Sequence, residues 1–355
     1  MSTLAPAVAP ERVARPPRIA TLDALRGFAL CGIIFANAPS ILRLDPLMSD
    51  GQIHPVAIWV DQLVQGRFFP LFSLLFGIGF GLIWAGAGGR TSTPRLVLPR
   101  RLLALGVLGA AHQVLQPGEA LLPYALAGLL VLLPATFLPR RARLLIMVAG
   151  VALTLVATAM GGGLVLVPGL FLIGFWLSDH IRGIDAAVDH LSPGVATVLS
   201  LVALAAAAAL AAVQLMAPGS ELLTGTLALG GAACGLILIT CALRTPAGPL
   251  LASVFAPLGR LALTNYVTAT LLLIMTGIGF GMNHLEPDLL WPMTMISCAM
   301  ILLLQVITSH LWSITVGQGP LKAAWRLVTW TGAAPATTHR VVTGSPLPGR
   351  RVASQ

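Results

Sequence analysis

Residues 194–216 read GVATVLSLVALAAAAALAAVQLM, 23 consecutive residues without a charged side chain. A helix of this length rises roughly 35 Å, enough to cross the hydrocarbon core of a bilayer, which is about 30 Å thick. The alanines at 205–209 provide a small-residue surface for close helix packing. An uncharged stretch of this length therefore predicts a membrane-spanning helix.

The composition of the whole chain agrees with this stretch. The 355 residues are 57% hydrophobic and 9% charged, with a mean hydropathy of +0.90, whereas soluble domains carry about 25% charged residues. In lipid only helices and closed barrels satisfy every backbone amide. A barrel would show short alternating segments, but the apolar runs here last roughly 18 to 25 residues. The predicted class is all-α: a polytopic transmembrane helical bundle.

We predict a single transmembrane domain over residues 21–330, with a short interfacial helix near 249–258. A cytoplasmic tail, 1–20, precedes this domain. A basic tail rich in Pro, Gly and Thr, 331–355, follows it and is predicted to be disordered. About ten spans are expected, at residues 25–42, 68–88, 99–116, 120–138, 143–160, 163–179, 194–216, 224–243, 260–282 and 289–314.

The positions of the basic residues predict the orientation. With the N-terminus inside, 17 of the 21 Lys and Arg residues fall in inside loops and tails. Arg43 and Arg67 fall in the predicted outside loops, and Arg26 and Arg260 lie at span entrances. Because positive charge is retained on the cytoplasmic side, both termini are predicted to be cytoplasmic.

Several function classes are disfavoured. A net charge of +9 suggests nucleic acid as a partner for a soluble chain, but here the charges occupy loops and tails, so no nucleic-acid partner is expected. The four cysteines lie within apolar segments and lack metal-ligand spacing. The glycines of FGIGFG, residues 76–81, lie inside a span with no preceding strand, so helix packing explains them better than dinucleotide binding. No metal, haem or nucleotide cofactor is indicated.

Ionisable groups at span ends are costly and are therefore candidate functional residues. Asp23 and Arg26 are three residues apart, a spacing that places them on one helix face, close enough to pair. The pair serves either as an interfacial anchor or as a carboxylate that holds an arginine for an anionic ligand. Arg260, followed by Asn265 and Tyr266, faces the same side and either joins Arg26 around phosphates or meets lipid headgroups alone.

Two histidines are candidates at the outer face. His112 ends the third predicted span, and Glu119 follows it across a short loop. A histidine and a carboxylate joined by a tight turn can form a general-base pair, although the sequence alone slightly favours a solvated histidine at the headgroup boundary. His54, in the first outside loop, is a second candidate.

Seven short stretches carry a resemblance to a known family. They are RIATLDALRGFAL (18–30), LFSLLFG (71–77), RRLLALGVLGAAH (100–112), GEALLPYA (118–125), GRLALTNY (259–266), GPL (319–321) and WR (325–326). In this order, from residue 18 to 326, they resemble the YeiB-like, domain-of-unknown-function 418 (DUF418) family of bacterial inner-membrane proteins. The first motif is similar to that of two groups of transmembrane acyltransferases, the acyltransferase-three proteins and the heparan-α-glucosaminide N-acetyltransferases.

The resemblance implies a chemistry. Those acyltransferases move an acyl group from cytoplasmic acyl-CoA to a sugar at the far side of the membrane. By this resemblance His112, with Glu119 beside it, would deprotonate the acceptor hydroxyl or amine. The working histidine of the sugar N-acetyltransferases lies in the first outside loop, so His54 stays open as the alternative. The expected donor-binding residues are Asp23, Arg26, Arg260, Asn265 and Tyr266, with the two arginines near the donor phosphates.

Two other functions stay open at this stage. A small-solute transporter or exporter would use the same polar groups for passage, but the two halves of the chain show no convincing internal repeat of the kind many transporters have. A non-enzymatic accessory protein would use them for orientation and packing. The expected partners are the lipid bilayer and a small-molecule or glycan acceptor, and the sequence does not identify the acceptor, the acyl chain or the oligomeric state.

Overall fold

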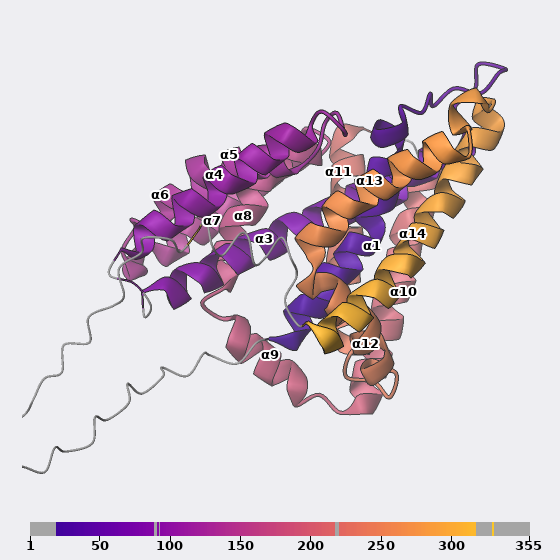
Figure 1. Cartoon of the computed structure of the whole chain (residues 1–355). Helices are drawn as coiled ribbons and strands as arrows, with labels where there is room; N and C mark the ends of the chain where they lie inside the picture. The colour runs from indigo at the N-terminus through magenta and orange to yellow at the C-terminus, as the bar shows by residue number, and fades with distance from the viewer. Residues whose placement is uncertain (1–18, 89–90, 92, 217–219, 317–328, 330–355) are drawn as a thin grey trace, which may run out of the picture.

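The computed structural model describes residues 19–88, 91, 93–216, 220–316 and 329 (Figure 1). The predicted tails, 1–20 and 331–355, lie almost entirely outside the described residues, as do the GPL and WR motifs at 319–326. The described residues are mainly helical. The α-helices are α1 (Ala20–Leu42), α2 (Pro55–Trp59), α3 (Gly66–Ala87), α4 (Pro94–His112), α5 (Leu121–Ala127), α6 (Leu133–Ala135), α7 (Arg143–Ala159), α8 (Leu166–Leu177), α9 (Ile181–Asp189), α10 (Pro193–Met216), α11 (Glu221–Ala242), α12 (Gly248–Arg260), α13 (Ala262–Gly279) and α14 (Pro287–Thr315).

Each predicted span coincides with a helix, and the prediction of a multi-pass helical membrane protein is confirmed. Six helices within the described part of the chain are long and apolar enough to cross a membrane: α1, Pro55–Ala87, α10, α11, α13 and α14. A bent pair, Gly163–Leu177 with Ile181–Asp189, would make a seventh. The helices Leu121–Ala135 and Arg143–Ala159 are shorter, and α4 carries three arginines in its 19 residues. The count of about ten spans therefore stays a prediction.

The segment between the first two predicted spans, residues 43–67, is partly helical. A continuous helix begins at Pro55, passes through a π-helical segment, Val60–Gln65, and joins α3. The Arg67 guanidinium donates to the Gln62 carbonyl and, over 3.1 Å, to Gln214 Oε1 of α10. A partner distant in sequence thus allows a cation inside an apolar helix.

The first and last helices of the described chain run in opposite directions. At one end of the bundle, Trp291 Nε1 of α14 donates to the Asp45 carbonyl, just after α1, over 2.8 Å. At the other end, Asn265 Nδ2 near the start of α13 donates to Ser309 Oγ near the end of α14 over 2.8 Å. The start of α1 and the end of α14 therefore lie on the same side of the bundle. The assignment of that side to the cytoplasm stays a prediction.

Helix α12 packs against the first turns of α1. The backbone of Phe255 lies against Gly27, and Gly259 lies against the carbonyl of Asp23, so that a Cβ at either glycine would overlap a backbone carbonyl. The interfacial helix predicted at 249–258 is thus present as a helix. Its contact with α1 is direct, backbone against backbone.

Close glycine contacts also join α3 to α8. A Cβ at Gly77 would overlap the Phe171 carbonyl, and one at Gly81 would overlap the Ser178 side chain. The FGIGFG segment is therefore a helix-packing surface, as predicted. Figure 1 shows α4 to α8 grouped on one side of the molecule and α1, α13 and α14 on the other, with α3 between the two groups.

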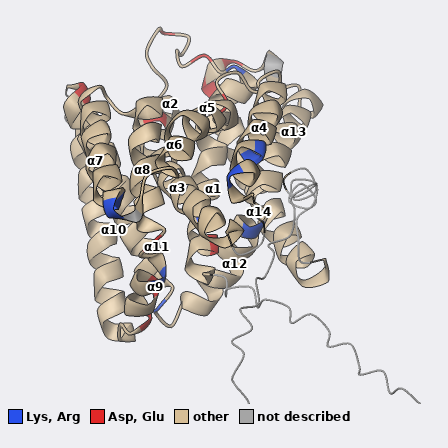
Figure 2. Ribbon diagram, turned by 90° about the vertical axis from the view of Figure 1, so that its left-hand side faces the viewer, with Lys and Arg blue, Asp and Glu red and all other residues tan. Residues whose placement is uncertain are grey.

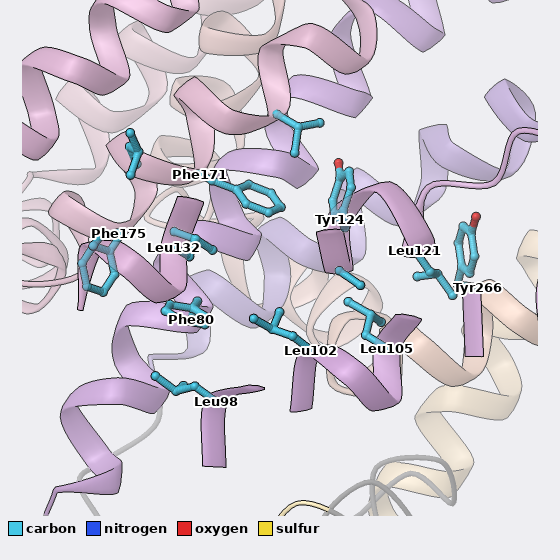
Figure 3. Packing of buried hydrophobic residues seen from close by; sticks show 14 of the residues in the cluster. Phe80, Leu98, Leu102, Leu105, Leu121, Tyr124, Leu132, Phe171, Phe175 and Tyr266 are labelled. Atoms are coloured by element: carbon cyan, nitrogen blue, oxygen red, sulfur yellow. The ribbon is translucent and has the colours of Figure 1, made fainter. Parts of the chain in front are cut away.

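An aromatic core fills the space between α3, α4, α5 and α8 (Figure 3). Tyr124 is 1% exposed, and its hydroxyl lies 2.6 Å from Ser73 Oγ. Four phenylalanine rings surround Tyr124, namely Phe69, Phe72, Phe76 and Phe171. This core fixes α4 and the start of α5, the two elements that carry the outer candidate residues.

Charged residues are sparse on the bundle, and most of the ribbon in Figure 2 carries none. A group of ion pairs joins α9 to α1 and α11 at the end of the bundle where α1 begins. Arg244 lies 3.2 Å from Asp185 and 2.6 Å from Asp189, and Thr21 Oγ1 of α1 donates to Asp185 over 2.7 Å. These contacts hold α9 against the start of α1 and the end of α11.

Two variants, each with one serine replaced by cysteine, test the predicted orientation. Ser49, in the loop after α1, and Ser192, between α9 and α10, are both exposed. Because the two positions are predicted to face opposite sides, Ser49→Cys is expected to react with a membrane-impermeant maleimide on spheroplasts. Ser192→Cys is expected to react only after the membrane is opened. The native chain, with its four cysteines in apolar helices, is the background control, and the reverse labelling would contradict the orientation.

Candidate functional site

The buried candidate site, predicted to lie near the outer face, begins with Glu119 at the turn between α4 and α5. Gly118 adopts a positive φ of 76°, which suits a glycine, and the turn sends the following residue back toward α4. The Glu119 carboxylate accepts the backbone N–H groups of Leu121 over 2.6 Å and of Leu122 over 2.7 Å. Glu119 is fully buried, and its negative charge lies at the favourable N-terminal end of the α5 dipole.

His112, the last residue of α4, lies beside this carboxylate. Its Nδ1 is 3.8 Å from Glu119 Oε2, and its side chain is 2% exposed. Neither ring nitrogen forms a hydrogen bond in the described part of the structure. A solvated histidine at the headgroup boundary, the alternative considered from the sequence, does not fit this burial. A buried polar group without a partner is costly, so this histidine is a candidate functional group rather than a packing residue.

Tyr266 of α13 completes the site from the opposite side. Its ring centroid lies 5.3 Å from that of His112, and its hydroxyl accepts the Ala120 N–H over 3.5 Å. The side chains of Gln116 and Asn37 lie within hydrogen-bonding reach of the same hydroxyl. Tyr266 therefore joins α1, α4 and the α4–α5 turn at one point.

We call this group the polar core cluster. Thr270, one turn after Tyr266, donates to Gln116 Oε1 over 3.1 Å and extends the group along α13. All members except the half-buried Asn37 are at most 6% exposed. The cluster consists of Asn37, His112, Gln116, Glu119, Tyr266 and Thr270.

A small cavity of about 10 Å³ borders the cluster between α1, α13 and α14. Its volume suits about one water molecule. The polar residues that line it are Asn37, Tyr266, Thr270 and Gln305. Gln305 Nε2 of α14 also donates to the Asn265 carbonyl over 2.8 Å, so polar contacts continue from the cavity along the α13–α14 interface.

The opposite end of α1 carries the predicted ion pair. Arg26 Nη1 lies 3.2 Å from Asp23 Oδ1, and both side chains are partly exposed. Arg26 Nη2 lies 3.0 Å from the position that a Cβ of Gly79 would take, so this glycine of α3 makes room for the guanidinium. The pair predicted from the spacing is therefore present.

The other expected donor-binding residues have contacts of their own. Arg260 Nε donates to the Ala256 carbonyl of its own helix over 3.3 Å, and the preceding residue, Gly259, lies against the Asp23 carbonyl. Asn265 donates to Ser309, and Tyr266 belongs to the polar core cluster. Asp23 and Arg26 thus lie together near the start of α1, and Tyr266 contacts His112 inside the bundle.

His54 has a structural role in this fold. Its Nδ1 accepts the Val56 N–H over 3.1 Å and caps α2, and its ring stacks on Trp291 at 6.0 Å. It contacts no other predicted site residue in the described structure. Of the two histidines, His112 is the one with free ring nitrogens beside a carboxylate.

Sequence reasoning missed two members of the cluster. Gln116 falls in a short loop and Thr270 inside an apolar span, where a threonine commonly bonds its own helix. The position of Gln116, a polar residue between His112 and Glu119 in the sequence, was a signal that could have identified it. No local signal marks Thr270, because its partner is 154 residues away.

Gly109 is expected to control the geometry of the site. A Cβ there would lie 2.5 Å from Leu122 N and 2.8 Å from Glu119 Oε1, so Gly109→Ala should push the turn away and destabilise the protein by roughly 1–3 kcal/mol. Gly106→Ala, one turn earlier, meets only the Ala125 Cβ at 3.5 Å and serves as the matched control. The free energy of unfolding in mixed micelles measures both. Equal losses of stability in Gly109→Ala and Gly106→Ala would contradict the close contact of Gly109 with the α4–α5 turn.

Comparison with known proteins places the chain in a family. Residues 188–332 match the family described as "Protein of unknown function (DUF418)". The "Uncharacterized 39.9 kDa protein in amylase 3'region" of Bacillus acidopullulyticus is 30% identical over 345 residues, which cover 90% of this chain and 96% of that protein. The chain belongs to the DUF418 family.

Two further relatives match shorter parts of this DUF418 chain. YeiB of Escherichia coli (strain K12) is 34% identical over 123 residues, 32% of this chain and 30% of its own length. YxaH of Bacillus subtilis (strain 168) is 34% identical over 148 residues, which cover 38% of this chain and 35% of YxaH. No solved structure matches the chain significantly. The 188–332 match includes Tyr266 but not His112 or Glu119, which fall within the chain-length match to the Bacillus acidopullulyticus protein.

Proposed function

We propose that this DUF418 membrane protein transfers an acyl group from cytoplasmic acyl-CoA to an envelope or exported acceptor, with His112 as the general base. The observation that carries the proposal is the fully buried His112–Glu119 pair, in which both imidazole nitrogens lack a hydrogen bond. Basic catalysts need a free nitrogen beside a group that stabilises the protonated form. The motif that resembles acyltransferases, residues 18–30, adds independent support.

The proposed reaction assigns one role to each side chain. The acceptor hydroxyl or amine gives its proton to His112 Nε2 as its oxygen or nitrogen bonds to the thioester carbon. Glu119, beside Nδ1, stabilises the imidazolium that forms. The carbon–sulfur bond then breaks, and the proton passes from the imidazolium to the departing thiolate. The 3.8 Å separation of His112 Nδ1 from Glu119 Oε2 can shorten during the reaction, because catalytic hydrogen bonds often tighten only when substrate binds.

Tyr266 has a separate role in the proposal. Its hydroxyl lies among Ala120 N, Gln116 and Asn37, and its ring faces His112. A buried hydroxyl held in place by several polar groups can donate to the oxyanion of the tetrahedral intermediate, an interaction that is strong where water is excluded. The polar core cluster thereby supplies a base and an oxyanion donor together.

Proton-coupled transport of a small solute is the second candidate. It is favoured by the enclosed polar groups around the cavity, Asn37 and Gln305, because buried ionisable and polar residues in membrane proteins often relay protons. In both proposals the protein works in the cytoplasmic membrane of a bacterial cell. The excess of basic residues on one predicted side and the bacterial origin of the relatives support that location.

Inside-out vesicles test the two candidates against each other. Vesicles containing the protein receive acetyl-CoA labelled in the acetyl group on their outer, cytoplasmic face. Acyl transfer predicts label in a lumenal or membrane acceptor together with an equal amount of free coenzyme A thiol. Vesicles from cells without the protein are the control. Solute uptake that follows the pH gradient, with no thiol released, would replace the acyltransferase proposal with transport.

A further inference from the structure

Three members of the polar core cluster, His112, Gln116 and Glu119, lie at the tip of a short helical hairpin. The buried Glu119 is the one Asp, Glu, Lys or Arg in residues 102–139, and arginines flank this stretch on both sides, at 95, 100 and 101 and again at 140, 141 and 143. Because clustered basic residues mark the cytoplasmic headgroup level, both ends of the hairpin are predicted to lie there. The α4–α5 turn is the part of the hairpin farthest from that level.

The two limbs of this hairpin are too short to cross the bilayer. From Leu102 to His112, α4 rises roughly 16 Å, and the second limb, Leu121–Ala135, rises roughly 22 Å. The hydrocarbon core is about 30 Å thick, so the turn ends roughly 8 to 14 Å short of its far boundary. The polar side chains of the turn are therefore expected inside the hydrocarbon layer rather than at the outer headgroups.

Helix α1 gives an independent measure of the same depth. It has 23 residues and rises roughly 34 Å, enough to cross the core completely. Asn37, within hydrogen-bonding reach of the Tyr266 hydroxyl, precedes the last residue of α1 by roughly 8 Å along the axis. The cavity beside the cluster is also lined by Ile33 and Ile34, a turn further inward. The polar core cluster thus lies below the end of α1 as well.

The surface of the α4–α5 turn suits a position in lipid. Val114 is 81% exposed and Leu115 is 38% exposed, whereas Glu119 is fully buried. The loop after α1 and the connection into α14 instead expose carboxylates, namely Asp45, Asp50, Glu286 and Asp288. Apolar side chains are costly to expose to water but not to hydrocarbon. The turn that covers His112 is therefore suited to face acyl chains.

Helices α4 and α13 meet at this level through side chains. The ring centroids of His112 and Tyr266 lie 5.3 Å apart. Within the described chain, these two helices do not have the close backbone packing that joins α1 to α12. Side chains can rotate aside without separating two helix backbones. A molecule in the bilayer therefore reaches the cluster with least disturbance between α4 and α13.

We propose that the acceptor is a membrane lipid with a free hydroxyl or amine, which enters the polar core cluster from the bilayer between α4 and α13. The inference rests on the proposed acyl transfer and names the substrate class of the same site. The lipid gives its proton to His112 Nε2 as its oxygen or nitrogen bonds to the thioester carbon. The carbon–sulfur bond breaks, and the departing thiolate takes the proton. A water-soluble acceptor would have to lose its hydration to reach this depth, which is costly for polar groups.

Spin labelling of the purified full-length protein in nanodiscs tests the depth of the turn. Val114→Cys, Leu115→Cys and Ser49→Cys each receive a nitroxide, whose relaxation by oxygen, concentrated in hydrocarbon, is compared with relaxation by a water-soluble nickel chelate. The ratio of oxygen to nickel relaxation is expected to be several-fold higher at positions 114 and 115 than at 49. The native chain measures the label taken up by its four cysteines. The unfolding temperature identifies any variant that fails to fold, and the other turn position then replaces it. Equal ratios at the turn and at position 49 would overturn the proposal.

The class of acceptor is tested in inside-out vesicles, whose native lipids are the probe. After reaction with acetyl-CoA labelled in the acetyl group, the vesicles are extracted with chloroform and methanol. The proposal predicts label in the lipid phase, equal in amount to the coenzyme A thiol released, and loss of both in His112→Leu. Vesicles from cells without the protein are the control.

The proposal and the acyltransferase function fail separately. Label in a water-soluble product, with an equal amount of thiol, overturns the lipid acceptor and keeps the proposed function. Absence of both thiol and labelled product removes the proposed function, and the lipid acceptor with it, whatever the depth of the turn.

Discussion

His112→Leu is expected to abolish acyl transfer and to leave the protein at least as stable as the wild type. Loss of a general base lowers the rate by roughly 10²–10⁴-fold. A buried polar group without a hydrogen bond costs roughly 1–3 kcal/mol, and within the described part of the chain neither nitrogen of His112 forms one. Leucine of similar size removes that cost. Acetyl transfer in vesicles and the free energy of unfolding measure the two effects.

Gln116→Leu is the control for this prediction. Gln116 is also buried, but its Oε1 accepts the Thr270 hydroxyl. Its replacement leaves that hydroxyl unpaired and should destabilise the protein by about 1–3 kcal/mol. A loss of stability in His112→Leu as large as that of Gln116→Leu would identify the histidine as a structural residue. If His112→Leu still transfers the acetyl group, His112 is not the general base.

Gly259→Ala is expected to destabilise the fold by about 3 kcal/mol, the upper range for an overpacked site. A Cβ there would overlap the Asp23 carbonyl, and the same change at Gly27 would overlap the Phe255 carbonyl. Both obstacles are backbone atoms, which cannot rotate away as a side chain can. Helices α1 and α12 would have to separate, which would also move Arg26. The free energy of unfolding in mixed micelles and coenzyme A binding would both report the change.

Gly279→Ala provides the matched control for Gly259→Ala. Gly279 lies in α13 with no atom within 4 Å of an added Cβ, so alanine there should be neutral or stabilising by roughly 0.5–1 kcal/mol through helix propensity. A small effect at Gly259, similar to that at Gly279, would show that α12 does not contact α1 as described.

Most of the helical fold could be predicted from the sequence, because a run of apolar residues of bilayer length has few alternatives in lipid. The sequence did not show that the helix containing Arg67 begins at Pro55, and the reason is physical. Arg67 inside a helix is costly unless a partner satisfies it, and the partner, Gln214, lies on α10. Nothing near Arg67 in sequence indicates that contact.

The candidate site was predictable only where its parts are close in sequence. The turn at Gly118 brings His112 beside Glu119 over seven residues, so their proximity follows from the short loop. Tyr266 reaches this pair from a helix about 150 residues later, and a local pattern cannot show that. The tyrosine was therefore assigned to the cytoplasmic donor set.

The end of the bundle where α1 begins shows the same limit. The spacing of Asp23 and Arg26 predicts their pair because both lie on one turn of one helix. Arg260 is expected near this pair because it follows a span entrance on the same predicted side. The contact of its neighbour Gly259 with the Asp23 carbonyl depends on how α12 packs against α1, which no local pattern in the sequence shows.

The central claim is that acyl transfer takes place at His112, with donor phosphate held near the start of α1. A cryo-electron microscopy map of the protein in nanodiscs with coenzyme A tests it most directly. The account predicts phosphate density beside Arg26 and the thiol end of the ligand directed toward His112. Density for coenzyme A elsewhere, with Arg26 facing lipid and His112 enclosed by side chains alone, would contradict it.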